Sequence, residues 1–173
     1  MQRWGMLARD MYMPEPPPFA EFYGAQFQRI AVQLYAYLGD HAEAQDLAQE
    51  AFCRALQQWP KIARYDDPAG WVRRVAWNLA TSRLRRLQTA IGFLARQREQ
   101  HVEGPSPDRV ALVAALATLP PAQRRALVLH HLAQLGVAEI AEQEGVAEGT
   151  VRSWLTRGRA RLAAQLTPEV WHA

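Results

Sequence analysis

The stretch GVAEIAEQEGVAEGTVRSWLTRGRARL, residues 136–162, decides the fold expected for this chain. It predicts two helices joined by a tight turn. Gly145 falls at the turn, where the backbone needs a positive φ that glycine adopts without a steric penalty. After the turn, Val151, Trp154 and Leu155 recur at helical spacing and form an apolar stripe. The pattern is typical of a helix-turn-helix, whose second helix enters the major groove of DNA.

The outer face of the second helix carries the side chains that we expect to contact DNA. Thr150, Arg152 and Ser153 lie near the helix N-terminus, where side chains reach base edges. Arg157 and Arg161 follow further along, at positions suited to phosphate contacts. An ordinary helical hairpin with a basic, solvated outer face is the alternative interpretation of this stretch.

Apolar periodicity along the rest of the chain predicts an all-α protein with two small helical domains joined by a flexible linker. The expected units are a flexible lead-in over residues 1–18, a first domain over 19–88, a linker over 89–107, a second domain over 108–166 and a tail over 167–173. The expected helices cover 19–38, about 41–58, about 69–88, a short optional helix around 91–100, then 109–119, 122–133 and the helix-turn-helix. Proline and glycine predict a loop over 61–70.

Charge is distributed unevenly along the chain, whose formal net charge is +3. Between Trp71 and Arg98 there are seven arginines and no acidic residue. Such a run of one sign within a periodic helix indicates a surface that binds a polyanion. The expected helix over 41–58 instead carries Glu43, Asp46 and Glu50 at i, i+3 and i+7. DNA would repel this acidic stripe, so it faces either solvent or a basic protein partner.

The chain offers no recognisable catalytic, metal or cofactor site. Its five histidines lack a second ligand at metal spacing. Cys53, as the single cysteine, forms neither an internal disulfide nor a zinc site. We therefore expect a protein that is not an enzyme and needs no metal or cofactor. No apolar run is long enough to cross a bilayer and no secretory signal is visible, so we expect no membrane insertion and a cytoplasmic location.

Four segments, taken in order, resemble the extracytoplasmic-function sigma factors of bacterial RNA polymerase, in particular a subgroup common in actinobacteria. The segments are DLAQEAF at 46–52, WVRRVAWNLA at 71–80, LPPAQR at 119–124 and the helix-turn-helix. Their order and spacing are similar to the family over about residues 19–166. The resemblance implies a sigma-2-like helical bundle followed by a sigma-4-like helix-turn-helix domain.

The resemblance implies a role for each surface. The acidic helix, through Asp46, Gln49 and Glu50, would dock on the clamp helices of the largest subunit of the polymerase core, with the polymerase flap as a further contact. The loop over 61–69 and the helix after it would open and read the −10 element of promoter DNA. The implied −10 residues are Arg64, Asn78, Ser82, Arg85 and Arg86. The implied −35 residues are Thr150, Arg152, Ser153, Arg157 and Arg161. An anti-sigma factor, often membrane-anchored in this family, would hold the protein inactive.

Several positions depart from the family pattern. Ser82 replaces an aspartate and Thr81 a hydrophobic residue, which bears on −10 specificity. Ala147 replaces the serine that usually caps the recognition helix, at a cost of about 1 kcal/mol unless Glu148 compensates at the helix N-terminus. Gly136 replaces a similar serine before the preceding helix, which is a milder change because glycine is tolerated there.

Two other classes of protein remain open on the residues alone. A helix-turn-helix regulator that acts without polymerase explains the basic surfaces but gives the acidic helix no role. An interaction protein, such as an anti-sigma factor, predicts no DNA contact and leaves both basic surfaces unexplained. A sigma factor, which recognises −35 and −10 elements and helps to melt the −10 region, uses all of these features.

Overall fold

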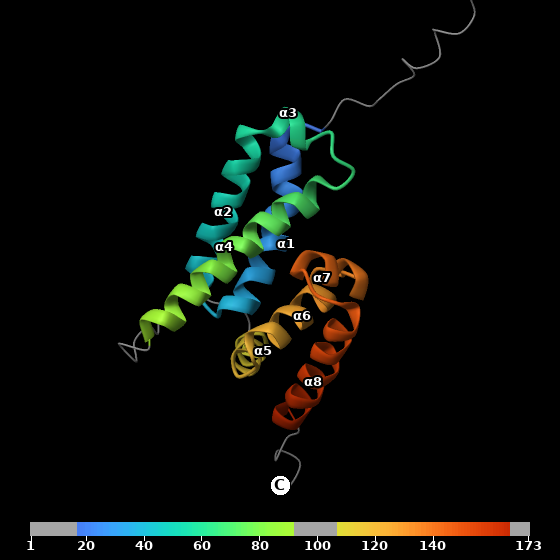
Figure 1. Ribbon diagram of the computed structural model, residues 1–173. Coiled ribbons are helices and arrows are strands. Elements are labelled where there is room, and N and C mark those ends of the chain that lie inside the picture. The colour runs from blue at the N-terminus through green and yellow to red at the C-terminus, as the bar shows by residue number, and fades with distance from the viewer. Residues whose placement is uncertain (1–16, 92–106, 167–173) are drawn as a thin grey trace, which may run out of the picture.

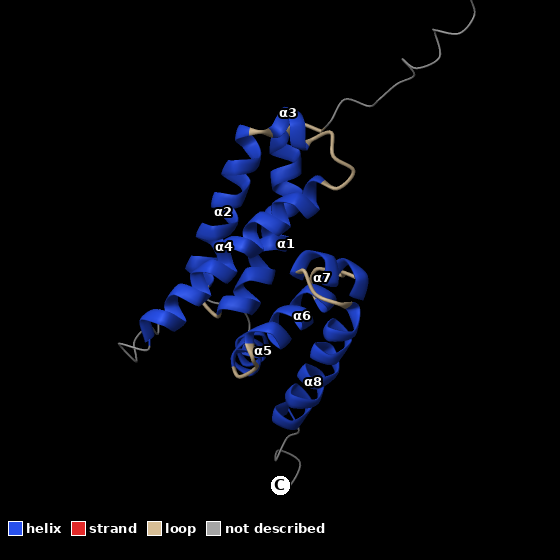
Figure 2. Ribbon diagram, viewed as in Figure 1, coloured by secondary structure: helices blue, strands red, loops and turns tan. Residues whose placement is uncertain are grey.

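The computed structural model describes residues 17–91 and 107–166, which form helices and, within these ranges, no strand (Figures 1 and 2). The helices are α1 (Phe19–Leu38), α2 (His41–Gln57), α3 (Trp59–Ile62), α4 (Pro68–Ile91), α5 (Pro107–Ala117), α6 (Pro121–His131), α7 (Val137–Glu144) and α8 (Glu148–Leu166). The predicted all-α class is confirmed. The short optional helix over 91–100 lies almost wholly outside the described residues, as do nearly all of the lead-in and the whole tail.

Two details differ from the expected helices. The loop predicted over 61–70 overlaps the end of a short helix, α3, which begins at Trp59. Pro60 is compatible with this helix because the first helical turn needs no backbone N–H from it. The helix expected over about 69–88 continues to Ile91 and begins at Pro68.

The first three long helices form one bundle around α1. The C-terminal half of α1 is buried on nearly every side, from Ile30 to Tyr37. α2 presents four small residues to this bundle, and Ala44, Ala48, Ala51 and Ala55 are fully buried. Small side chains let helix axes approach closely, so α1, α2 and α4 enclose a dense core. Trp77 of α4 is 2% exposed and donates from Nε1 to Gln33 Oε1 over 3.4 Å.

The turn between α1 and α2 is explained by the residues that form it. Gly39 ends α1 with φ +79°, and its N–H donates to the Tyr35 carbonyl at 2.8 Å. Asp40 then caps α2, since its Oδ1 accepts from the Glu43 N–H at 2.9 Å. Both features are explained by the free groups at helix ends.

The helix-turn-helix consists of α7 and α8. Gly145 joins them with φ +66°, the left-handed conformation that its position predicted. Of the expected apolar stripe on α8, Val151 and Leu155 are buried and Trp154 is half-buried, and Ile140 and Ala141 of α7 are buried with them. α6 packs across α8 and completes the unit.

The two units pack against each other. α5 and α6 both contact α1, and Figure 1 shows α6 and α7 beside the α1–α4 bundle with α8 on their outer side. The sequence predicted two domains joined by a flexible linker, and it did not predict that the domains pack against each other. Apolar contact explains part of it: Val113 of α5 is 7% exposed and its Cγ1 lies against Gly39.

Gly158 should test the close packing of α8 on α6. A Cβ at this position would lie 2.8 Å from Leu127 Cδ1, and Leu127 is only 3% exposed. We expect Gly158→Ala to lower the free energy of unfolding by about 1–3 kcal/mol through overpacking, as measured by urea denaturation. Gly149→Ala is the matched control, because its Cβ meets nothing within 4 Å. A neutral Gly158→Ala would contradict the close approach.

Candidate nucleic-acid interface

The outer surface of α8 is available for DNA. Val151, Leu155 and Gly158 face the core, which leaves the remaining arc of the helix to solvent. Arg152 and Arg157 are exposed, and Thr150 and Ser153 are half-buried. The entry to α7 is capped through its third residue, because Glu139 Oε2 accepts from the Gly136 N–H at 2.7 Å. At α8, Glu148 pairs with Arg152 at 2.6 Å, which holds its carboxylate in the first turn.

The five predicted −35 residues do not share one side of α8. At 100° per residue, Thr150, Ser153, Arg157 and Arg161 fall within an arc of about 80°. Arg157 Nε donates to Ser153 Oγ at 3.0 Å, so these two side chains are in contact. Arg152 lies about 160° from Thr150 around the axis. Arg161 donates to Gln123 Oε1 of α6 at 3.0 Å and is therefore tied to its own domain.

The predicted −10 residues also separate into groups. Asn78 and Arg85 lie on one face of α4 together with Arg74 and Thr81, within an arc of about 60°. Ser82 and Arg86 lie beside this face and contact each other, since Arg86 Nε donates to the Ser82 carbonyl at 3.3 Å. Asn78, Ser82, Arg85 and Arg86 are all exposed. Arg64 is exposed too, but it lies in the loop between α3 and α4, in a separate hollow with Lys61 and Tyr65.

The predicted polymerase-docking residues form one exposed patch. Asp46, Gln49 and Glu50 are all exposed on the side of α2 opposite its buried alanines. Tyr23 Oη donates to Gln49 Oε1 at 2.8 Å and fixes that amide. Glu50 pairs with Arg54, also on the surface. The third member of the acidic stripe, Glu43, is instead engaged by Arg83 of α4, so only the outer part of the stripe is free for a partner.

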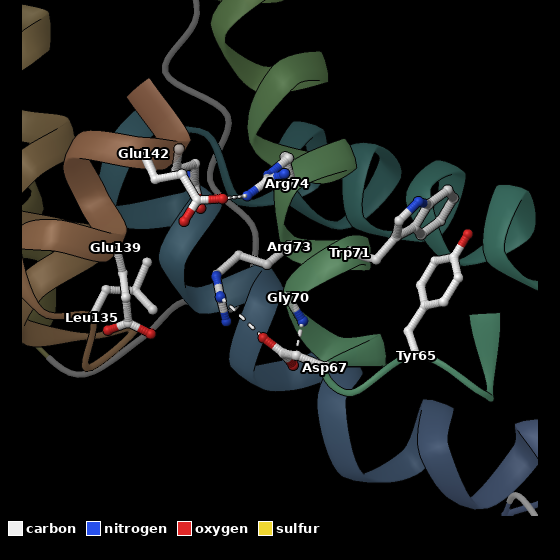
Figure 3. Close-up of a pocket in the computed structure, with 10 residues that line it drawn as sticks. Tyr65, Asp67, Gly70, Trp71, Arg73, Arg74, Leu135, Glu139 and Glu142 are labelled. Carbon is white, nitrogen blue, oxygen red and sulfur yellow. Dashed lines mark hydrogen bonds and ion pairs between the residues drawn. The ribbon is translucent and has the colours of Figure 1, made fainter. Parts of the chain in front are cut away.

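A cleft of about 310 Å³ separates the start of α4 from α7 (Figure 3). Arg73 and Arg74 project into it from α4, and Glu139 and Glu142 project from α7 (Figure 3). Arg74 pairs with Glu142 at 3.5 Å. Arg73 pairs with Asp67 at 3.6 Å, and the Asp67 carboxylate also accepts from the Gly70 N–H at 2.7 Å. Trp71 is half-buried and also lines this cleft.

Two arginines of α6 connect the domains. Arg124 is 9% exposed and donates to the Tyr37 carbonyl of α1 at 2.8 Å, and also to the carbonyls of Ala117 and Leu119. Its guanidinium lies 5.9 Å from the centre of the Tyr37 ring. Burial lowers the pKa of Arg124, and the nearby Tyr37 acts in the opposite direction. The three carbonyl acceptors compensate the charge for lost hydration.

The neighbouring Arg125 also reaches across. It pairs with Glu144 of α7 and donates to Thr81 Oγ1 of α4 at 3.1 Å. Burial raises the pKa of Glu144, although Arg125 lowers it in part. The side chains of Arg125 and Glu144 are 17% and 9% exposed, so water screens this pair little.

Sequence reasoning missed these interdomain residues. Arg124 lies in the LPPAQR segment, and the sequence indicated it only as one residue of the family resemblance. One signal was available: the four residues after Arg125, 126–129, are all apolar and all buried. A helix that is apolar on several faces packs against more than one neighbour, and α6 does contact α1, α7 and α8.

An apolar groove of about 250 Å³ runs between α5, α6 and α8. Leu112 and Leu132, at its rim, are 41% and 42% exposed. His131 also lines it. Burial lowers the pKa of His131, and His130 and Arg159 lower it further.

Two further properties concern residues 17–91 and 107–166 alone. None of their helices is both long and apolar enough to cross a membrane. They contain no group of three or more His, Cys, Asp or Glu side chains placed to hold a metal ion.

Comparison with known proteins agrees with this geometry. Residues 23–90 match the family described as sigma-70 region 2, and residues 109–162 match sigma-70, region 4. The RNA polymerase sigma-E factor of Streptomyces antibioticus is 36% identical over 135 residues, which cover 73% of this chain and 72% of the relative. The ECF RNA polymerase sigma factor SigC of Mycobacterium tuberculosis is 30% identical over 148 residues, 82% of this chain and 80% of the relative.

A solved structure shares the fold. It is the sigma factor RpoE of Bartonella quintana, determined in complex with the anti-sigma factor NepR. The TM-score is 0.72 at 22% identity, over 87% of this chain and 98% of that one. Together with the two matched families, the α1–α4 bundle and the α5–α8 unit define a two-domain sigma factor.

This chain belongs to the extracytoplasmic-function sigma factors of bacterial RNA polymerase. Its function is promoter-directed initiation of transcription. Sigma factors are initiation factors rather than catalysts, and the catalytic centre belongs to the polymerase. The regulator that acts without polymerase, one of the two alternatives left by the sequence, is not favoured.

Arg124 should be far more important for stability than an exposed arginine. We expect Arg124→Met to lower the free energy of unfolding by about 2–4 kcal/mol, because three carbonyl groups lose a charged donor. Arg54→Met is the matched control, since its pair with Glu50 is on the surface and should contribute no more than about 0.5 kcal/mol. Urea denaturation followed by circular dichroism measures both. Equal effects would contradict the role of Arg124.

Proposed function

We propose that this sigma factor divides initiation among three surfaces. The acidic patch on α2 binds the polymerase core, the arginine-bearing face of α4 reads and helps to melt the −10 element, and α8 reads the −35 element. The observation that carries this proposal is the separation of charge. Acidic residues gather on the exposed side of α2, while α4 between Trp71 and its end at Ile91 carries arginines and no carboxylate.

The α2 patch is suited to a basic protein surface. Asp46, Gln49 and Glu50 are exposed, and Tyr23 holds the Gln49 amide in place. Complementary charge favours fast and specific association. We propose the clamp helices of the largest polymerase subunit as the partner of this patch.

The α4 face is suited to a DNA strand. Asn78 and Arg85 lie one above the other on it, and Ser82 and Arg86 flank them. Extrusion of a base costs a few kcal/mol, which contacts to the base and the backbone must offset. We propose that Asn78 contacts a −10 base and that Arg85, Arg86 and the loop residue Arg64 contact phosphates. Ser82 supplies a neutral hydroxyl where the family pattern has an aspartate.

The α8 surface is suited to duplex DNA. We propose that Thr150 and Ser153 contact base edges on one side of the helix, and that Arg152 contacts them from the other. Arg157 and Arg161, further along, contact phosphate and set the register of the helix in the major groove. Both sides of one helix can be used because the major groove encloses it.

The apolar groove in the second domain is suited to a further protein contact. Leu112 and Leu132 expose apolar surface at its rim, and exposed apolar patches mark interaction sites. We propose the flap of the polymerase as its partner. We further propose that an anti-sigma factor holds the free protein in the cytoplasm, that the chain catalyses no reaction, and that it requires no metal or cofactor.

Charge reversal should separate docking from folding. We expect Asp46→Arg with Glu50→Arg to abolish binding to purified core polymerase and run-off transcription from genomic fragments, because repulsion replaces attraction. Glu21→Arg with Asp108→Arg is the matched control, since both residues are exposed and outside the patch. Retained core binding by the first pair would remove α2 as the docking site. Wild-type protein that adds no transcripts to those of core alone would overturn the proposed function.

Arg152 and Arg157 should contribute differently to −35 binding, Arg152 to sequence preference and Arg157 to the overall affinity. In holoenzyme, we expect Arg152→Ala to relax −35 sequence preference by about 1–3 kcal/mol, because an arginine fork discriminates between bases. Arg157→Ala should instead weaken binding to all sequences alike and lower its salt dependence. Selection of promoters from a randomised −35 library measures both properties. An unchanged preference in Arg152→Ala would refute its contact with bases.

A further inference from the structure

We infer that Tyr23 is a positioning residue for the binding of polymerase core, and that it makes Gln49 a hydrogen-bond donor within the acidic patch of α2. The surface that meets the patch then carries basic groups opposite Asp46 and Glu50. Opposite Gln49 it carries a hydrogen-bond acceptor, which is a carbonyl or carboxylate oxygen. This inference rests on the proposed docking role of α2, and it specifies the chemistry of the partner surface.

The first step is that the ring of Tyr23 has little freedom to move. It stacks on Phe27 of the next turn of α1, with ring centroids 4.9 Å apart and planes 24° apart. It meets Phe52 of α2 edge-on at 5.1 Å, and Phe19 of the preceding turn at 6.2 Å. Phe52 is 1% exposed, so the ring is anchored to the core of the bundle. Aromatic pairs at these separations are favourable, and together they hold the plane of the Tyr23 ring.

The second step is that this ring places its hydroxyl at the exposed side of α2. Tyr23 Oη donates to Gln49 Oε1 at 2.8 Å, a usual distance for a hydroxyl donor. Because Oε1 is committed to Tyr23, the amide turns its Nε2 group away from the hydroxyl. Nε2 has two N–H donors. One donates to the sulfur of Cys53 over 3.8 Å, a weak acceptor, and no described residue takes the other.

The third step is that the patch is not an acceptor surface throughout. Asp46 and Glu50 carry carboxylates, which only accept hydrogen bonds when they are ionised. Gln49 lies on the same exposed side of α2, and there it offers an N–H group. A partner that presented basic groups alone would leave this N–H without an acceptor, and a buried polar group without a partner lowers the affinity. The partner surface therefore holds an acceptor at this point.

The fourth step is that the Tyr23 hydroxyl selects this orientation of the amide. The two ends of an amide are so similar in shape that the hydrogen-bond network distinguishes them, and packing does not. Without the hydroxyl, Gln49 can turn its Oε1 outward and add a further acceptor to the patch. Tyr23 thus acts through Gln49, because its hydroxyl decides whether the patch presents a donor or an acceptor there.

Gln49→Glu separates hydrogen bonding from charge, because the two predict opposite results. Glutamate keeps the shape of the side chain and still accepts from Tyr23, but it loses the N–H donors and adds a negative charge. We expect it to weaken binding of the full chain to purified core polymerase at least about fivefold, since an acceptor on the partner then faces a carboxylate. Bio-layer interferometry with immobilised core measures the affinity.

Gln28→Glu is the matched control for this charge. Gln28 is exposed on α1, outside the patch, so the substitution adds the same charge without removing a donor from α2. It should change the affinity for core by less than about twofold, because an exposed charge away from the contact is screened.

Tyr23→Phe tests the positioning, since it keeps the ring contacts and removes the hydroxyl. We expect core binding to weaken about two- to fivefold, while the midpoint of urea denaturation stays near that of the wild type because the lost bond is exposed. Tyr35→Phe is the matched control, because Tyr35 lies about three turns further along α1, against His41 at the start of α2. In a Gln49→Ala background, Tyr23→Phe should have no further effect on core binding, because the hydroxyl acts through the amide.

Two results would overturn the inference. One is core binding by Gln49→Glu that is as tight as that of the wild type, or tighter, because the patch would then act through charge alone. The other is a loss from Tyr23→Phe that is equally large in the Gln49→Ala background. Failure of the docking role itself has a separate signature: the chain with Asp46→Arg and Glu50→Arg would retain core binding.

Discussion

The burial of one guanidinium, that of Arg124, is the interaction on which the arrangement of this protein depends. Arg124 donates to the carbonyl groups of Ala117 at the end of α5, of Leu119 two residues later, and of Tyr37 on α1. A buried arginine needs carbonyl groups in place of its lost hydration; both terminal nitrogens of Arg124 have such partners, whereas its Nε has none. The contact therefore requires the end of α5, the start of α6 and the last turn of α1 to be in place together. The position of the helix-turn-helix depends on α6, because α6 packs directly on α8.

Acidic and basic side chains are divided between the helices. The acidic side chains of α2 either face outward, as Asp46 and Glu50 do, or neutralise an arginine of α4, as Glu43 does. Those of α7 approach α4 through Glu142 and α6 through Glu144. In the free chain, α4 is thus surrounded by carboxylates on two sides. Glu43 and Glu142 therefore partly compensate the charge of the α4 arginines.

The three proposed surfaces differ in how firmly the fold holds them. The docking patch lies on a helix whose inner face of alanines allows no rotation without a loss of packing. The proposed −35 surface lies on α8, whose Gly158 lies so near Leu127 that a larger residue would force the Leu127 side chain to shift. The proposed −10 surface shares its helix face with Arg74 and Thr81, which contact the second domain.

The sequence by itself determined the local structure of this protein. Helical periodicity, Gly39, Asp40 and Gly145 were enough to locate the helices and the helix-turn-helix, because the conformational preferences and hydrogen bonds behind these signals act between residues close in the chain. The acidic patch was also predictable, since residues at i, i+3 and i+4 share a helix face. Only the tertiary structure decided that Arg124 is buried, that Arg161 is tied to Gln123, and that α7 faces Arg74. Arg124 and Tyr37 are far apart in the chain, and nothing local distinguishes an arginine that binds a distant carbonyl from one that binds phosphate.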